Sequence, residues 1–389
     1  MIMFHRVFRT VAFVCLVTLG LSCFACLWDQ DTLLMERQRF PSALELITGR
    51  FLRHSPDFYR WRIEDRESRI ESESTPELFD DLAVSYEKVG DTENAIRVIK
   101  DKDALFPGLY TTHANLGTFY FHAGRYEDGL KEIDKALAIN ADAHFGREVY
   151  QKRLVEYLLS KKGDGELKLP LSPESVSGIN DGGFAQYLLS DGSKGLAHGE
   201  SDAQLDKAVK GVLGMMKFGN YDSPILLEVL GDLLLSRRFP ADAKQLAARA
   251  YLKASYESTD EEAKKVYRKK ALSSLKFQTR GSESTKQLAI GKVEREFAGE
   301  LRSADEWYQT LVEQEKSWIS TGVNVDEAFG EKYYEEPVFE SESVTVRKNA
   351  VWIPVVFVLG VMCVCVVGLI LKVRGTARHA IEKVEKAKL

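Results

Sequence analysis

The chain has 389 residues, which is more than one compact core usually accommodates and enough for two or three modules or one elongated repeat array. Charged residues make up 29% of it and the formal net charge is −5, so the composition indicates neither a nucleic-acid-binding protein nor a disordered polyanion. The cysteines lie near the two ends, so the body from residue 27 to 349 has neither a disulfide nor an internal thiolate site; they are Cys15, Cys23, Cys26, Cys363 and Cys365.

The start of the chain has the order of a secretory signal. Arg6 and Arg9 precede an apolar run from Val11 to Leu21, and small residues follow up to Ala25. A basic start, a short apolar stretch and a small-residue exit are typical of signal peptides. Residues 1–25 are therefore predicted to be a signal peptide or an N-terminal signal anchor, and lipid attachment to the cysteine that follows is a further alternative.

A second apolar segment, residues 350–371, carries no charged side chain along its whole length. Because about 20 apolar residues in a helix span a hydrocarbon core of about 30 Å, we predict a single transmembrane helix here. Lys372, Arg374 and Arg378 follow at once, and positive residues stay on the cytoplasmic side, so the basic tail 372–389 is predicted to lie inside. The basic N-terminus leads to the same orientation, which places the body outside the cytoplasm.

The middle of the chain contains an internal repeat. Two stretches match at a constant offset of 34, with apolar or small residues at every corresponding position except one histidine. Each copy carries a glycine placed to end a first helix, where a C-terminal cap favours positive φ. The first copy has Phe79, Leu82, Ala83, Tyr86, Gly90, Ala95, Ile99, Leu105 and Pro107, and the second has His113, Leu116, Gly117, Tyr120, Gly124, Gly129, Ile133, Ile139 and Ala141.

This pattern resembles the tetratricopeptide repeat (TPR), a family of stacked helix pairs. In that family small residues such as Gly117 and Gly129 let paired helices approach closely, and an aromatic residue such as Tyr120 fills the space beside them. A third copy is expected from Leu227 to Ala250, after an insertion that breaks the register. The resemblance implies an all-α fold, a TPR-like α-solenoid of helix pairs with an irregular insertion, to which the sequence adds the C-terminal transmembrane helix.

The remaining segments are assigned by composition. Gly, Ser and Asp are frequent between Lys161 and Ser201, and the stretch from Phe329 to Val346 is acidic and aromatic without a helical period. We expect a helical N-terminal cap at 26–70, TPR-like repeats at 71–160, a loop-rich insertion at 161–222, further TPR-like and long helices at 223–325, and an acidic linker at 326–349.

The resemblance also implies a binding groove, because the first helices of successive TPR pairs line a surface that receives peptides or partner helices. The expected groove has an acidic wall beside a neutral, partly apolar one, which favours a basic or apolar segment of a protein partner. The alternative is that these residues are merely exposed, or are covered by the chain's own insertion. Carried over by position, the groove residues are Glu77, Asp80, Val84 and Glu87 of the first copy and Thr111, Ala114, Thr118 and Phe121 of the second.

No catalytic, metal or cofactor motif is present in the sequence. The spacing of His113, His122 and His144 matches no metal signature, and His113 is expected to be a satisfied, partly buried side chain. The chain has no GxSxG motif, Walker loop or GxGxxG motif. We therefore predict a protein that is not an enzyme and that uses no metal or cofactor.

These observations favour a membrane-tethered periplasmic TPR protein of the bacterial cytoplasmic (inner) membrane that mediates protein–protein interaction or complex assembly, without binding nucleic acid. The bacterial assignment rests on the absence of cysteines and of an Asn-x-Ser/Thr sequon in a body predicted to be secreted. The oligomeric state stays open.

Two other classes of function stay open. A cell-envelope enzyme would need its site in the insertion 161–222, where the titratable residues are mainly Asp181, Asp191, His198 and Glu200. A receptor-like relay would act through the tail, although the stretch after Leu371 is short for an output domain.

Overall fold

The computed structural model describes Leu27 and Asp29 and, in addition, residues 40–141, 143–163, 167–172, 183–192, 198–236, 241–278, 285–287, 289–335 and 337–338. The chain divides into two units, residues 1–340 and 341–389, and every described residue belongs to the first unit. The predicted signal at 1–25, transmembrane helix at 350–371 and basic tail at 372–389 lie outside the described residues. Within the described part, no helix is both long enough and apolar enough to span a membrane.

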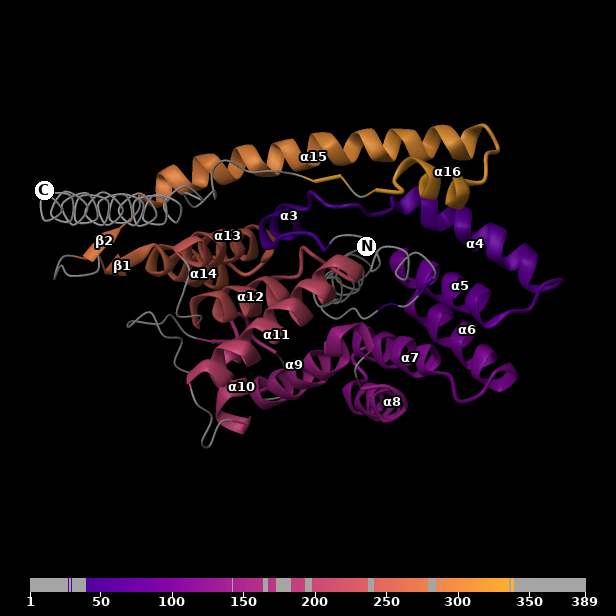
Figure 1. The fold of residues 1–389 in the computed structure, drawn as a ribbon, viewed down its shortest axis with the longest axis horizontal. Helices are drawn as coiled ribbons and strands as arrows, with labels where there is room; N and C mark the ends of the chain where they lie inside the picture. Colours follow the sequence, from indigo (N-terminus) through magenta and orange to yellow (C-terminus); the bar gives the residue numbers. More distant parts are fainter. Residues whose placement is uncertain are drawn as a thin grey trace, which may run out of the picture. The chain divides into compact units, whose positions relative to one another are not determined.

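The described body is built of α-helices, which confirms the expected all-α class for that part of the chain (Figure 1). The only strands among the described residues are a short antiparallel pair in which Phe277 faces Lys286. The elements are α3 (Ala43–Thr48), α4 (Pro56–Ile70), α5 (Pro76–Lys88), α6 (Thr92–Leu105), α7 (Tyr110–His122), α8 (Tyr126–Ile139), the 3₁₀ turn η1 (Ala143–Gly146), α9 (Arg147–Lys161), α10 (Phe184–Gly192), α11 (His198–Phe218), α12 (Pro224–Ser236), α13 (Ala241–Glu257), α14 (Glu261–Ser274), β1 (Lys276–Gln278), β2 (Thr285–Gln287), α15 (Ile290–Ser320) and α16 (Val325–Lys332).

Local sequence signals set the ends of the repeat helices. Thr75 caps α5 by accepting the N–H of Leu78 at 3.4 Å, and the proline that follows takes the first helical position, where no backbone donor is needed. Gly90 and Gly124 adopt φ values of 87° and 73° just after α5 and α7. Such left-handed caps favour glycine, so both glycines end the first helix of a pair as the sequence predicts.

Small residues bring the helices of each pair into close contact. A Cβ added at Gly117 of α7 would lie 2.8 Å from the Ile133 side chain of α8, and one at Gly231 of α12 would lie 2.6 Å from the Tyr251 ring of α13. Distances this short leave no room for a larger residue. The sequence therefore forms helix pairs α5–α6, α7–α8 and α12–α13 at the positions expected for the three copies.

The segment 161–222 differs from the expected loop-rich insertion, because α10 and α11 lie in it. Helix α11 packs against α9 and α12, and Met215 and Met216 are buried in the core. Its glycines lower helix propensity but serve packing: a Cβ at Gly211 would lie 2.8 Å from the ring of Tyr150 on α9. The packing of α11 against α9 and α12 thus stabilises a helix in a segment whose composition predicted loops.

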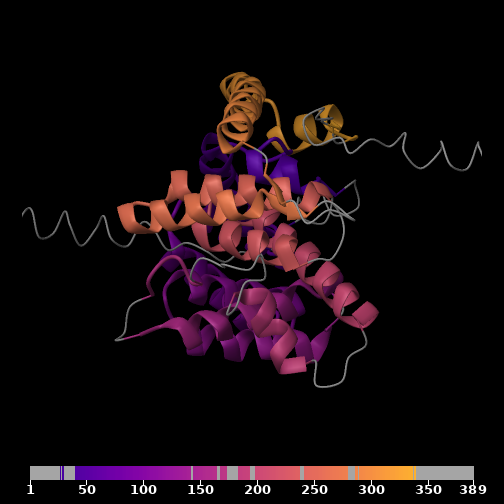
Figure 2. The same ribbon diagram turned by 90° about the vertical axis from the view of Figure 1, so that its left-hand side faces the viewer.

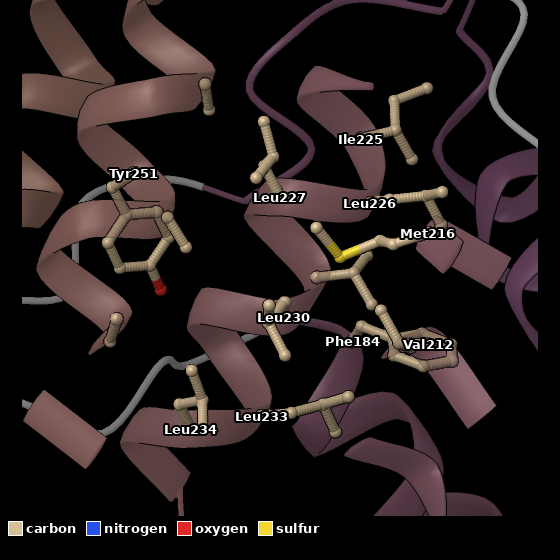
Figure 3. Close-up of a cluster of buried hydrophobic side chains, with 14 of the residues drawn as sticks. Phe184, Val212, Met216, Ile225, Leu226, Leu227, Leu230, Leu233, Leu234 and Tyr251 are labelled. Atoms are coloured by element: carbon tan, nitrogen blue, oxygen red, sulfur yellow. The ribbon is translucent and has the colours of Figure 1, made fainter. Parts of the chain in front are cut away.

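Helix α12 is the centre of the larger hydrophobic core (Figure 3). Apolar residues cover every side of it, which is typical of a helix enclosed by others. In Figure 3, Tyr251 of α13 lies on one side of α12, and Phe184 of α10 and Met216 of α11 lie on the other. A smaller core lies between α4, α5, α6 and α7 and includes Leu27.

The long helix α15 runs along one side of the body over α3 and α13 and reaches α4, as Figures 1 and 2 show. A short turn then leads to α16, which occupies the first residues of the expected linker 326–349. Asn324 caps this helix, and its apolar residues Val325 and Phe329 are four positions apart and buried. The expectation of an irregular linker is therefore wrong for residues 326–332.

Candidate functional site

The predicted groove residues differ widely in exposure. Only the side chain of Glu77 is exposed, and those of Glu87 and Thr111 are half-buried. In this conformation a partner would therefore reach few of these side chains, and the binding of a protein here stays a prediction. The other five side chains are buried, namely Asp80, Val84, Ala114, Thr118 and Phe121.

Asp80 belongs to an internal polar cluster. Its carboxylate accepts a hydrogen bond from Lys102 Nζ at 2.7 Å and from Asn115 Nδ2 at 3.0 Å, and Lys102 Nζ also donates to Thr111 Oγ1 at 2.6 Å. Burial raises the pKa of the Asp80 carboxyl to about 7, against the opposing effect of the Lys102 ammonium. The cluster therefore ties α5, α6 and α7 together. Sequence reasoning missed Lys102, because a lysine on an amphipathic helix is normally solvated.

The chain itself covers part of the first helix pair. Lys88, at the end of α5, donates hydrogen bonds to the backbone carbonyls of Phe218 and Gly219 at 2.8 and 3.0 Å. These two carbonyls belong to the turn between α11 and α12, which lies in the segment 161–222. Gln151 of α9 covers the second pair in a similar way, donating to Thr118 Oγ1 at 3.1 Å. The segment 161–222 therefore contacts the end of α5 through this turn, whereas the contact with Thr118 comes from α9, which precedes that segment.

A cavity of about 190 Å³ lies where this turn meets the rest of the body. It is bounded by the connection from α3 to α4, the end of α5, the α11–α12 turn and α15. The predicted groove residue Val84 forms part of its wall. Three cationic and three phenolic side chains line it: Arg53, Lys88 and Lys217, and Tyr59, Tyr221 and Tyr308.

Arg53 is held between aromatic rings. Its guanidinium carbon lies 3.6 Å from the centroid of the Tyr308 ring and 4.7 Å from that of Tyr221. Its Nη1 group donates to the Gly49 carbonyl, and Nη2 donates to the Tyr221 hydroxyl at 3.3 Å. Within the described part of the chain Arg53 contacts no carboxylate. Stacking on the rings fixes the plane of the guanidinium at the cavity.

Lys88 has a strongly perturbed environment. Burial lowers the pKa of its ammonium to about 8, whereas the carboxylates of Asp29 and Glu87 oppose the change and the Arg53 guanidinium adds to it. Neither carboxylate forms an ion pair with it, since the contacts of Lys88 within the described residues are the two backbone carbonyls. Two cations without an ion pair therefore line the same small cavity.

A second polar cluster is enclosed in the larger core. Lys270 Nζ lies 2.7 Å from Glu228 Oε1, 3.2 Å from Asp232 Oδ1 and 2.8 Å from Ser172 Oγ. Glu228 also accepts the Ser172 N–H at 3.0 Å and the Tyr267 hydroxyl at 2.8 Å. All of these side chains are almost inaccessible to solvent. The cluster therefore holds the segment 167–172 against α12 and α14, and it has no open face for a substrate.

Among the described residues, no group of three or more His, Cys, Asp or Glu side chains is arranged to hold a metal ion. His113 is half-buried and its Nδ1 lies 2.7 Å from a Glu132 oxygen, as expected for a satisfied side chain. The titratable residues named for an enzyme site in 161–222 lie outside the described side chains.

Comparison with known proteins matches this chain to no family model and to no curated protein. Evidence on function therefore comes from the contacts within the body.

Proposed function

We propose that this protein is a membrane-tethered, non-enzymatic scaffold whose helix pairs belong to a TPR-like α-solenoid and whose body binds a protein or peptide outside the cytoplasm. The observation that carries the proposal is the regular pairing of helices at the repeat positions. Gly117 contacts Ile133 in the second pair, and Gly231 contacts Tyr251 in the later one. Arrays of this kind present extended surfaces that bind partners.

The exposed side chains indicate where such a partner would bind. Leu105 ends α6 and Ile139 ends α8, at corresponding positions of the two copies, and they are 59% and 50% exposed. Single exposed apolar residues are common on protein surfaces, but two at the same repeat position form a regular feature of the array. The exposed Glu77 contributes an acidic group at the start of α5. An apolar partner segment with a basic residue fits these side chains.

Cross-linking of the intact protein in its native membrane, followed by mass spectrometry of captured proteins, tests this proposal. A double variant, Leu105→Asp with Ile139→Asp, is expected to lose a specific set of partners and to stay folded, because both side chains are exposed and each aspartate at a helix C-terminus costs only about 0.3–1 kcal/mol. Val323→Asp is the matched control, since Val323 is 43% exposed and lies between α15 and α16, away from the repeats. Retention of every partner by the double variant contradicts this surface, and capture of no specific partner contradicts the scaffold.

Membrane topology is tested separately. A reporter that is active only outside the cytoplasm, fused after residue 335, is expected to be active, and the same reporter fused after residue 389 is expected to be inactive. The reverse result contradicts the proposed orientation.

A further inference from the structure

The cavity beside Lys88 is small, with a volume of about 190 Å³, and it is partly open to solvent. Segments that are distant in the sequence form its wall, from Arg53 through Lys88 and Tyr221 to Tyr308. Its wall combines charged and aromatic side chains, which is the kind of lining that binds small polar molecules.

The ammonium of Lys88 has a donor that remains available at this cavity. Two of its N–H groups donate to the Phe218 and Gly219 carbonyls, and no acceptor within the described residues takes the third. The guanidinium of Arg53 likewise has no carboxylate partner in the described part of the chain. Both side chains are partly accessible to solvent.

The carboxylates near the cavity form their ion pairs with other side chains, and one of them, Asp29, also lines the cavity. Each carboxylate that acts electrostatically on Lys88, Tyr221 or Tyr308 contacts a further side chain. The contacts are those of Asp29 with Arg62 at 3.1 Å, Glu87 with His122, Asp222 with Lys253 at 2.5 Å, Glu315 with His54 at 2.7 Å, and Asp57 with Arg60 at 2.7 Å.

The fully buried cations of the same protein form ion pairs with carboxylates. A cation held away from water without a counter-charge is unfavourable, so buried lysines and arginines normally pair with carboxylates. This protein follows that rule elsewhere in its interior, with Lys102 2.7 Å from Asp80, Lys270 2.7 Å from Glu228, and Arg249 2.8 Å from Glu300. Arg53 and Lys88 are only partly buried, form no ion pair among the described residues, and line the same cavity.

We propose that this cavity binds a small organic anion, a carboxylate with a flat apolar body of about the size of benzoate. The carboxylate would lie against Lys88 and Arg53, where it supplies the missing counter-charge. The flat body would lie among the rings of Tyr59, Tyr221 and Phe218, which line the same space. This site is independent of the protein-binding surface at the ends of α6 and α8, so either proposal stands if the other fails.

The test is isothermal titration and thermal denaturation of the full-length protein in detergent, with benzoate as the probe. Benzamide has the same shape without the charge, and inorganic phosphate has the charge without the flat body. Benzoate is expected to bind and to raise the melting temperature, and benzamide is expected to bind at least tenfold more weakly. Equal binding of benzoate and benzamide contradicts the role of the cations, and binding of phosphate alone contradicts the assignment to an organic anion.

Variants locate the binding in the cavity. Lys88→Met is expected to weaken benzoate binding at least tenfold, and Lys88→Arg is expected to restore part of it. The matched control is Lys269→Met, which replaces an exposed lysine of α14 and is expected to bind benzoate as the wild type does. Unchanged binding in Lys88→Met contradicts the proposal.

A measurement on the unsubstituted protein covers the case in which Lys88→Met does not fold. Acetic anhydride acylates the neutral amine of each lysine, and mass spectrometry follows Lys88 and Lys269 within one sample. A bound carboxylate keeps Lys88 protonated and shielded, so benzoate is expected to slow acetylation of Lys88 at least fivefold without changing that of Lys269. Equal rates with benzoate and benzamide contradict the proposal.

Discussion

Lys88 makes the stability of this protein depend on pH in the alkaline range. Burial lowers the pKa of its ammonium from 10.5 to about 8 in the folded protein, while the unfolded chain keeps the ordinary value. The groups that face it are Asp29, Glu87 and Arg53, together with two backbone carbonyls. A difference of about 2.5 pKa units at about 1.36 kcal/mol each makes the charged ammonium unfavourable by about 3 kcal/mol at neutral pH.

The sign follows from proton counting. Between pH 8 and 10.5 the unfolded state binds the proton of Lys88 and the folded state has released it, so the free energy of unfolding rises with pH in this window. We expect the wild type to gain about 3 kcal/mol relative to Lys88→Met between these two values. The hydrogen bonds lost in the variant shift its stability by an amount that does not vary with pH. Tyrosines that ionise at high pH are common to both proteins, so they cancel in the difference.

Urea denaturation at closely spaced pH values from 7 to 11 measures this difference, with Lys269→Met as the control that should follow the wild type. A difference between wild type and Lys88→Met that stays constant across this range would refute the reasoning, because Lys88 would then titrate alike in both states. Saturating benzoate is expected to flatten the rise, since a bound carboxylate restores the charged ammonium.

Three further predictions concern the packing of the body. Gly231→Val is expected to lower the free energy of unfolding by about 1–3 kcal/mol, because the added atoms meet the Tyr251 ring; the urea midpoint measures it, and an unchanged midpoint contradicts the close packing. Lys270→Met leaves the buried Glu228 and Asp232 carboxylates without their cation. It is expected to lower the free energy of unfolding by about 3–5 kcal/mol at pH 7 and by less at pH 5. Equal losses at the two pH values contradict this account. Phe329→Ala removes the ring that packs on His54 and is expected to raise hydrogen exchange of α16 without changing that of α12; uniform exchange rates contradict local docking.

The sequence was sufficient for features that depend on local spacing. The offset of 34 placed Gly90 and Gly124 at helix ends, and both have the positive φ that this position requires. The repeat pattern also placed Gly117 and Gly231 where helices pack most closely. Local spacing fixes such features, because a cap or a close contact within a pair involves residues that are near one another in the chain.

Features that depend on stacking in three dimensions were not predictable in this way. Lys102 lies 22 residues from Asp80 in the sequence, and only the packing of α6 against α5 brings their charges together. Gly211 lies in a segment that was expected to be loop-rich, whereas its lack of a side chain admits the Tyr150 ring against α11. Helix α16 is too short to show a period, and its docking depends on a distant histidine, His54.

The burial of Asp80 determines how the proposed groove has to be tested. A lysine at this position would stand beside Lys102 in the interior, where two like charges repel and the hydrogen bond from Asn115 Nδ2 loses its acceptor. Asp80→Lys is therefore expected to destabilise the protein by about 3–5 kcal/mol, and a loss of captured partners in this variant would report unfolding of the first helix pair. Glu77→Lys reverses an exposed charge in the first turn of the same helix, where the helix dipole favours an acidic group, and is expected to cost only about 1 kcal/mol.

Thermal denaturation of the two variants separates these effects before any capture experiment. If Asp80→Lys melts at the wild-type temperature, the Asp80 carboxylate of the wild type does not hold α5, α6 and α7 together. That result would favour the prediction that Asp80 belongs to a binding groove formed by the first helices. Suppose that Asp80→Lys is strongly destabilised and Glu77→Lys stays folded. The loss of a partner in the Glu77→Lys variant then indicates binding at α5 itself, because that change leaves the internal cluster intact.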